Sequence, residues 1–216
     1  MVRSRQTHRG KQERRGKVKR ERARFIILGF EGKNKTEYHY FKHFNRLQKR
    51  YILKFAPENA TDPYHVVDSV SKWIHKQKGK EAFDPKSDYA YAVFDTDTDI
   101  KREDQIKTAK EYAKQNGIQV LLSSPCFELW YILHFTDRRA AYSSNDAVIR
   151  ELRKYISGYE KNTDVFDKVF PGMSEAIDRA KKLRQYHEEW GHTRYIERNP
   201  SSDVDQLVEM LMRKDK

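Results

Sequence analysis

Carboxylate residues that follow two apolar runs are the groups in this sequence whose type and spacing could do chemistry. The run FIILGF is followed by Glu31, and the run YAYAVF is followed by Asp95, Asp97 and Asp99 at alternate positions. Mg²⁺ and Mn²⁺ prefer such oxygen ligands. A cation held there can polarise a phosphoryl oxygen, stabilise a leaving oxygen or generate hydroxide. The pattern predicts a metal site that acts on phosphodiesters, with Glu31 as a further ligand or a general base.

These motifs also allow other interpretations. A single D-x-D is also common where aspartates form turns at strand ends. The segment GFEGKNKT lacks the spacing of a phosphate-binding loop, and Glu31 would repel phosphate, so the sequence does not indicate an NTPase. His39 and His43 could share a helix face, but no glutamate follows His39 as the zinc motif H-E-x-x-H requires.

Glu128 stands out because it interrupts the apolar segment CFELWYILHF. A carboxylate among such neighbours must be paired, bound to a metal or protonated, and a structural salt bridge is the ordinary explanation. Cys126 in the same segment is expected to be a packed thiol. Asn199-Pro200-Ser201-Ser202 is typical of a turn followed by a helix N-cap.

The elements that must position these groups alternate along the first part of the chain. Four short apolar runs predict strands, with amphipathic helices between them: Phe25–Phe30, Tyr51–Phe55, Tyr89–Phe94 and Ile118–Leu122. This order predicts an α/β fold with a mostly parallel sheet flanked by helices. Ligands bind such sheets at the carboxyl ends of the strands, where both acidic groups would lie. In extended chain Asp95 and Asp97 would face the same way.

The second part of the chain reads as helices only. CFELWYILHF predicts a core helix that opens at Ser124-Pro125, and three later segments have helical apolar periodicity. The polar stretch Arg138–Asn145 is a plausible boundary. The expected organisation is an α/β core over residues 25–137 and a helical C-terminal part, residues 138–216, packed on it.

The positive charge is concentrated near the N-terminus. Of the net +12, residues 1–24 carry eleven Lys and Arg against Glu13 and Glu21, which leaves only +3 for the rest. This arm is expected to be disordered and to neutralise phosphates of DNA or RNA, although a merely solubilising tail would look the same. The residues expected to contact nucleic acid are Arg14, Arg15, Lys17, Lys19, Arg20 and Arg22.

Cysteine content and hydropathy suggest where the protein works. A single cysteine excludes an intramolecular disulfide and favours a reducing, cytoplasmic setting. No run approaches the roughly 18–20 apolar residues that span a bilayer, and the basic N-terminus lacks the apolar core of a secretory signal. No membrane association is therefore expected.

Four segments together resemble the RloB-like family, which occurs near restriction and phage-defence loci. They follow the family's order: ILGFEGKNKTEYHYF, VFDTD, SSPCFELWYILHF and RNPSSDV. The resemblance implies a Toprim-like domain, related to the catalytic part of topoisomerases, primases and overcoming-lysogenisation-defect nucleases. It also implies that Glu31, Asp95 and Asp97 form the catalytic and metal-binding set. Glu37 and Glu128 match further acidic positions of the family motifs.

Three functions compete on this basis. The first is a Mg²⁺-dependent nuclease, or nuclease-like effector, in abortive defence against phage or foreign DNA. The second is a module that binds nucleic acid or a partner without chemistry, and the third is a primase or nucleotidyl-transferase activity. Because the chain lacks the ATPase of the overcoming-lysogenisation-defect nucleases, a separately encoded ATPase is an expected partner.

Overall fold

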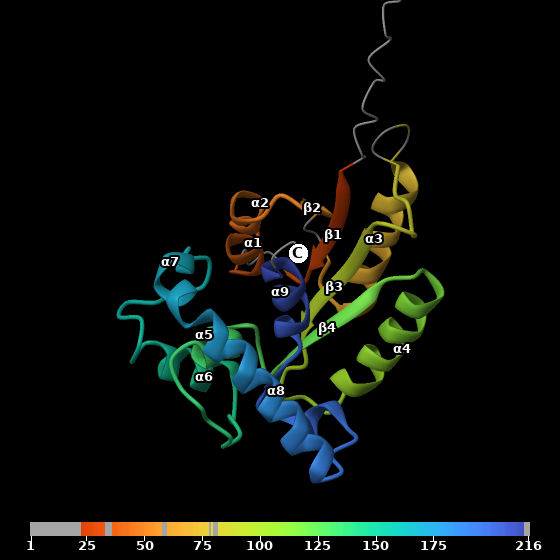
Figure 1. Cartoon of the computed structure of the whole chain (residues 1–216). Coiled ribbons are helices and arrows are strands. Elements are labelled where there is room, and N and C mark those ends of the chain that lie inside the picture. The colour runs from red at the N-terminus through yellow and green to blue at the C-terminus, as the bar shows by residue number, and fades with distance from the viewer. Residues whose placement is uncertain (1–22, 33–35, 58–59, 78, 80–81, 214–216) are drawn as a thin grey trace, which may run out of the picture.

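Within the residues that the computed structural model describes (23–32, 36–57, 60–77, 79 and 82–213), five strands form one sheet in the order β2-β1-β3-β4-β5 (Figure 1). Their bounds are β1 Arg24–Phe30, β2 Tyr51–Phe55, β3 Tyr89–Asp95, β4 Gln119–Ser124 and β5 Ser201–Ser202. β1 to β4 pair in parallel, and β5 pairs antiparallel to β4. The expected α/β fold with a mostly parallel sheet flanked by helices is confirmed.

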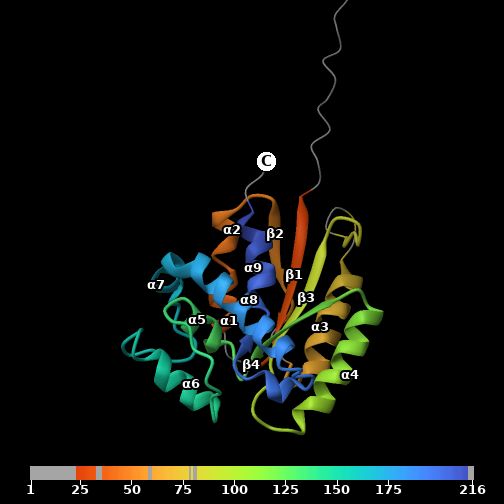
Figure 2. The same ribbon diagram turned by 60° about the horizontal axis from the view of Figure 1, so that its bottom comes forward.

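The two faces of the sheet are covered by different sets of helices, because side chains alternate along each strand. Phe25 and Ile27 of β1 pack in one cluster with α3 (Pro63–Lys76) and α4 (Arg102–Gln115). Ile26 and Leu28 point into the other, larger cluster. Figure 2 shows α3 and α4 together on one side of the strands and the remaining helices on the other.

The larger cluster is built mainly by short helices and by the second half of the chain. Two apolar helices are its centre: α5, which is buried along its whole length, and α9, whose apolar residues repeat every three to four positions. The bounds on this face are α1 Thr36–Phe41, α2 Phe44–Leu47, α5 Glu128–Leu133, α6 Asn145–Leu152, α7 Phe166–Val169, η2 Phe170–Gly172, α8 Met173–Glu189 and α9 Val204–Met212. The single turn η3, Tyr195–Arg198, joins α8 to β5.

Helix boundaries on the α3–α4 face follow the sequence signals. α3 begins at Pro63, and its N-cap Asp62 accepts a hydrogen bond from the backbone N–H of His65 at 3.1 Å. α4 ends at Asn116, and Gly117 adopts a left-handed φ of 65°. Both helices therefore start or stop where the sequence predicted.

Three expectations about the larger cluster were wrong. The spacing of Tyr40, Phe41, Phe44 and Leu47 is typical of one helical stripe after Thr36, but these residues belong to two short helices, α1 and α2, and the Leu47 side chain is exposed. The helix expected from Ser124-Pro125 begins only at Glu128, because Ser124 still pairs in β4. In the stretch Asn199-Pro200-Ser201-Ser202, which was expected to be a turn and a helix N-cap, the two serines form β5. The second part of the chain therefore does not consist of helices alone.

Two further expectations concern the basic arm and the absence of a membrane span. The basic arm, with its six candidate phosphate-binding residues, lies outside the described residues except for Ala23 and Arg24. Among the described helices, none combines the length and the apolar character that crossing a bilayer requires.

A buried histidine in the larger cluster makes stability depend on pH. His134 follows α5; its Nδ1 donates to the carbonyl of Trp130 at 2.8 Å, and its Nε2 is buried without a hydrogen-bond partner. Burial lowers the pKa of His134 to about 4. The ring is neutral in the folded protein but titrates near 6.5 when unfolded, so stability is complete above pH 6.5 and is lost as pH falls toward 4.

We expect the wild-type protein to lose about 2 kcal/mol more unfolding free energy than the His134→Asn variant between pH 7 and pH 5. Urea denaturation at the two pH values measures this difference. His75→Asn is the matched control, since His75 makes the same Nδ1 contact to a carbonyl four residues earlier but is exposed. Equal pH dependence in wild-type and His134→Asn proteins would refute the prediction.

Candidate metal centre

A cavity of about 200 Å³ opens at the carboxyl ends of β1 and β3. The chain reverses its direction of progress through the sheet between these two strands, since β2 lies on one side of β1 and β3 on the other. Such a switch point leaves a crevice where α/β proteins bind ligands. Phe30 pairs with Val93, so Glu31 and Asp95 follow almost level on neighbouring strands. Sheet topology thus brings together residues about sixty positions apart in sequence.

Five carboxylates line this cavity, which we call the acidic cavity. They come from the end of β1, from α1, from the end of β3 and from α5: Glu31, Glu37, Asp95, Asp97 and Glu128. Asn145, at the start of α6, and Lys161, in the loop before α7, also line it. All three predicted metal ligands, and two of the three additional candidates, are therefore at one place.

Glu31 is held by an arginine that the sequence analysis did not single out. Gly32 turns the chain with a left-handed φ of 79°, and its N–H donates to the carbonyl of Ala60 at 2.7 Å. The Glu31 carboxylate forms an ion pair with Arg102, the first residue of α4. Burial nevertheless raises the pKa of Glu31 above its ordinary value, against the lowering effect of Arg102.

Asp97 reaches the acidic cavity by a turn and not by strand alternation. β3 ends at Asp95, and Asp97 adopts a left-handed φ of 54°, which corrects the expectation of an extended D-x-D. Aspartate tolerates this conformation better than most residues, and functional sites often hold such strained positions. The N–H of Asp97 donates to the Pro125 carbonyl at 3.0 Å. Its Oδ1 accepts from Asn145 at 2.8 Å.

Glu37 and Glu128 are the most enclosed carboxylates of the set. Glu37 Oε2 is buried and has no hydrogen-bond partner. Burial is the main reason that the pKa of Glu37 rises to about 8. Glu128 accepts a hydrogen bond from the Tyr159 hydroxyl at 3.1 Å. No ion pair to Glu128 is formed within the described part of the chain, so a simple structural salt bridge does not explain its burial.

The carboxylates also act on one another. Burial, and then the nearby Glu37 and Glu128, raise the pKa of Asp95 well above its ordinary value. The same negative field raises the pKa of Lys161 despite the opposing effect of burial. The acidic cavity is therefore a place where negative charge is crowded and where a bound cation would be stabilised.

The carboxylates that line the acidic cavity are of the chemical type that binds Mg²⁺ or Mn²⁺. All the acidic ligands offer hard oxygen atoms, and the partnerless oxygen of Glu37 is a buried acceptor that a cation would satisfy. Over the described residues, however, no three Asp, Glu, His or Cys side chains converge closely enough to hold one ion. Arg102 pairs with Glu31 and its Nε lies 3.5 Å from Asp97 Oδ2, so its guanidinium supplies positive charge at this edge.

Other predicted site residues lie apart from the acidic cavity. Asp99 is exposed, and its carboxylate accepts from the N–H of Lys101 at 2.9 Å, just before α4. His43 contacts Asp164 at 2.9 Å and stacks on Phe166, which accounts for it without zinc. Cys126 is a buried free thiol, as expected.

Sequence reasoning missed three residues at this site: Asn145 and Lys161, which line the acidic cavity, and Arg102, which contacts Glu31 and Asp97 beside it. Arg102 directly follows the acidic run and Lys101, which is the one local signal that could have drawn attention to it. Asn145, at the start of α6, and Lys161, in the loop before α7, lie far along the chain, where spacing carries no information about the site.

Comparisons with known proteins identify the family of this chain. The model of the RloB-like protein family matches residues 26–211. A de novo designed Rossmann-fold protein is similar in structure with 14% identity and a TM-score of 0.30, covering 63% of this chain and 99% of the designed protein. The comparison with curated proteins gave no match. Because this match covers most of the chain, the chain belongs to the RloB-like protein family.

Proposed function

We propose that this protein is a Mg²⁺-dependent nuclease of the Toprim type, or a nuclease-like effector, which acts on nucleic-acid phosphodiesters in defence against phage. The observation that carries the proposal is the acidic cavity itself. Five carboxylates meet at the switch point of the sheet, and one of their buried oxygens has no partner. Crowded acidic groups of this kind cost stability, so their presence together favours a role in binding a cation.

Glu31, Asp95 and Asp97 would hold the metal ion, and Glu37 and Glu128 would extend the negative field around it. Such an ion supplies Lewis-acid stabilisation of a phosphoryl group and a more acidic bound water. Asn145 fixes the orientation of Asp97, and Tyr159 fixes that of Glu128. Lys161 and Arg102 place two positive charges beside the cavity, where an incoming phosphate would need them.

The remaining expected partners belong to the same proposal. The basic arm would increase affinity for DNA or RNA through its unspecific charge. A separately encoded ATPase would act together with this protein as a partner.

The proposal predicts cleavage that depends on a divalent metal. Purified protein should cleave supercoiled plasmid DNA or single-stranded RNA with Mg²⁺ or Mn²⁺, should stop in excess EDTA, and should recover when the metal is restored. Gel analysis of the products measures this. Cleavage that persists in EDTA, or that survives Glu31→Gln, would contradict the assignment.

A non-catalytic binding module is the second candidate, and one observation favours it. Arg102 already supplies a cation to Glu31, and no three of the described side chains converge on one metal position. In that case affinity for nucleic acid should fall steeply with salt and on removal of residues 1–22, and should ignore Mg²⁺. Fluorescence anisotropy with and without the metal distinguishes the two candidates.

A further inference from the structure

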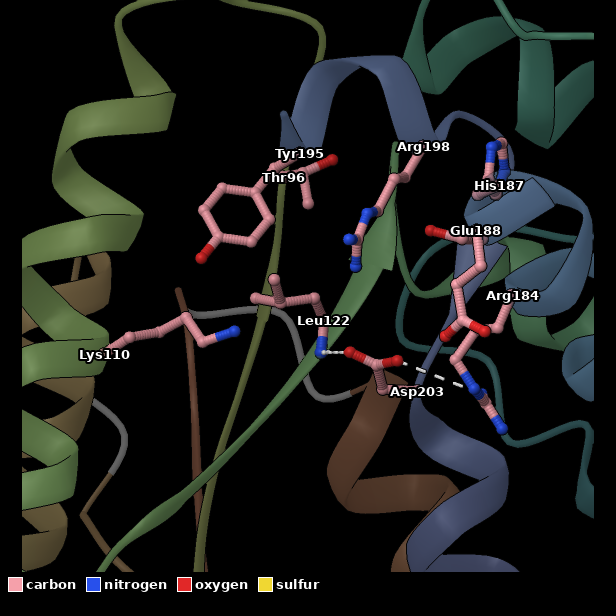
Figure 3. Close-up of a pocket in the computed structure, with 10 residues that line it drawn as sticks. Thr96, Lys110, Leu122, Arg184, His187, Glu188, Tyr195, Arg198 and Asp203 are labelled. Carbon is pink, nitrogen blue, oxygen red and sulfur yellow. Dashed lines mark hydrogen bonds and ion pairs between the residues drawn. The ribbon is translucent and has the colours of Figure 1, made fainter. Parts of the chain in front are cut away.

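A second cavity, drawn in Figure 3, lies beside Thr96, which directly follows β3, and beside Leu122 of β4. We call it the basic cavity. It is lined by residues of α4, β4, α8 and the segment from η3 to β5: Thr96, Lys110, Leu122, Arg184, His187, Glu188, Tyr195, Arg198, Ser201 and Asp203. Thr96 separates Asp95 from Asp97, so the two cavities share one strand end.

Among the described residues, two cations of the basic cavity lie outside ion-pair distance of any carboxylate. Neither Lys110 nor Arg198 forms an ion pair with a carboxylate in the described part of the chain. Lys110 Nζ lies 5.1 Å from the centre of the Tyr195 ring. Figure 3 shows the Lys110 amine and the Arg198 guanidinium directed toward the same space. These two groups are therefore available to an anion.

The other charged groups are largely satisfied by the protein. Arg184 forms a bidentate ion pair with the fully buried Asp205, at 2.5 and 2.6 Å. Asp203 accepts from the N–H of Leu122 at 3.3 Å and lies 3.9 Å from Arg184. Glu188 also lines the cavity, at its α8 side. Negative charge thus lies on the α8 and α9 side, and the unpaired positive charge lies on the α4 and η3 side.

The segment that presents Arg198 is fixed before any ligand arrives. Glu103 of α4 accepts from the N–H of Tyr195 at 3.0 Å. Arg198 Nε donates to the His192 carbonyl at 3.1 Å, which leaves its terminal nitrogens for a ligand. Asn199 exchanges two hydrogen bonds with the backbone of Tyr142, at 2.7 and 3.1 Å. A donor held in place in this way loses little entropy on binding.

Size and chemistry together select the ligand. The volume of the basic cavity is about 40 Å³. One water needs roughly 10–15 Å³ by this measure, so the space suits a single tetrahedral anion and excludes a base or a whole nucleotide. A lysine ammonium and an arginine fork are the side chains that proteins use most to hold phosphate.

We propose that the basic cavity is a phosphate-binding subsite, in which Lys110 and Arg198 hold one phosphate of the nucleic-acid chain while a neighbouring segment lies at the acidic cavity. This inference deepens the proposed nuclease function and rests on it for the identity of the ligand. It gives a role to the RNPSSDV segment: Arg198 supplies a ligand, and the residues around Asn199 hold it in position.

The test compares Lys110→Gln with Lys114→Gln in the full chain. Lys114 lies one helical turn further along α4, is exposed and does not line the basic cavity, so both variants lose the same charge from the same helix. Fluorescence anisotropy with labelled single-stranded oligonucleotides in EDTA measures affinity without cleavage. We expect Lys110→Gln to bind with a Kd about tenfold higher than that of Lys114→Gln. The slope of log affinity against log salt concentration should be smaller in magnitude by about 0.7 for Lys110→Gln than for Lys114→Gln. Arg198→Gln should behave as Lys110→Gln does.

Oligonucleotides with and without a 5′-phosphate identify the source of the anion. If Lys110→Gln weakens both equally, the subsite holds a backbone phosphodiester; if it weakens only the phosphorylated one, the subsite holds a terminal phosphate. Equal effects of Lys110→Gln and Lys114→Gln would overturn the subsite while metal-dependent cleavage still stands. Absence of any binding by the unaltered chain would overturn both proposals.

Discussion

Asp95→Asn is expected to lower metal-dependent cleavage by on the order of 10³-fold, and at the same time to make the metal-free protein more stable. The first effect follows because Asp95, the last residue of β3, lines the acidic cavity together with the other two proposed ligands. An amide keeps the shape of the side chain but loses the charge that a hard cation requires.

The second effect follows from crowding. Because burial and the nearby Glu37 and Glu128 raise the pKa of Asp95, its ionised form opposes folding near pH 7. Removal of that charge should therefore raise the free energy of unfolding of the metal-free protein near pH 7. Urea denaturation in EDTA measures the gain, and Mn²⁺ should stabilise the wild-type protein but not the variant.

Asp99→Asn is the matched control, since it makes the same aspartate-to-asparagine change further along the same acidic run. Asp99 is exposed and lies outside the acidic cavity, so both cleavage and stability should stay near wild-type values. If Asp95→Asn cleaves like wild-type protein, the metal-centre assignment fails. If Asp95→Asn is less stable than the wild-type protein in EDTA, the crowding argument fails.

Arg102→Gln is expected to increase affinity for Mn²⁺ by about tenfold, because the guanidinium and the metal ion compete for the same carboxylates. Arg102 pairs with Glu31, lies 3.5 Å from Asp97 and donates through Nε to the backbone carbonyl of Asp95 at 3.3 Å. The protein therefore carries its own cation at this edge.

The metal-free Arg102→Gln protein should lose about 2 kcal/mol of unfolding free energy, less than the 3–5 kcal/mol of a fully buried broken pair because both side chains keep some exposure. Mn²⁺ should then restore more stability to the variant than to the wild-type protein. Calorimetric Mn²⁺ titration and denaturation with and without the metal measure both effects. Arg150→Gln, the same substitution at an exposed position of α6, should change neither. Unchanged Mn²⁺ affinity in Arg102→Gln would exclude competition.

The framework of the fold could be predicted because buried parallel strands and amphipathic helices leave local signals. The apolar runs predicted β1 to β4 to within two residues at each end. The break between α1 and α2 had no such signal, since Tyr40, Phe41, Phe44 and Leu47 are spaced as in one continuous helix. β5 could not be predicted either, because two serines become a strand only by pairing with a partner far away in sequence.

The acidic cavity was predictable for a different reason. Sheet topology carries Glu31 and Asp95 to one edge, and a strand-helix order is enough to foresee that. The route taken by Asp97 was not foreseeable, because its left-handed backbone depends on contacts with Pro125 and Asn145. The position of Arg102 depends in turn on where α4 begins relative to the end of β1, which is a property of the packed molecule.

The antiparallel strand β5 has a consequence for the order in which the molecule is made. A ribosome delivers β4 long before β5, so the outer edge of β4 stays open while the α5–α8 stretch is synthesised. All residues of the acidic cavity have emerged by Lys161, but the basic cavity needs Tyr195 to Asp203. During its own synthesis the chain therefore completes the residues of the acidic cavity first and those of the basic cavity last.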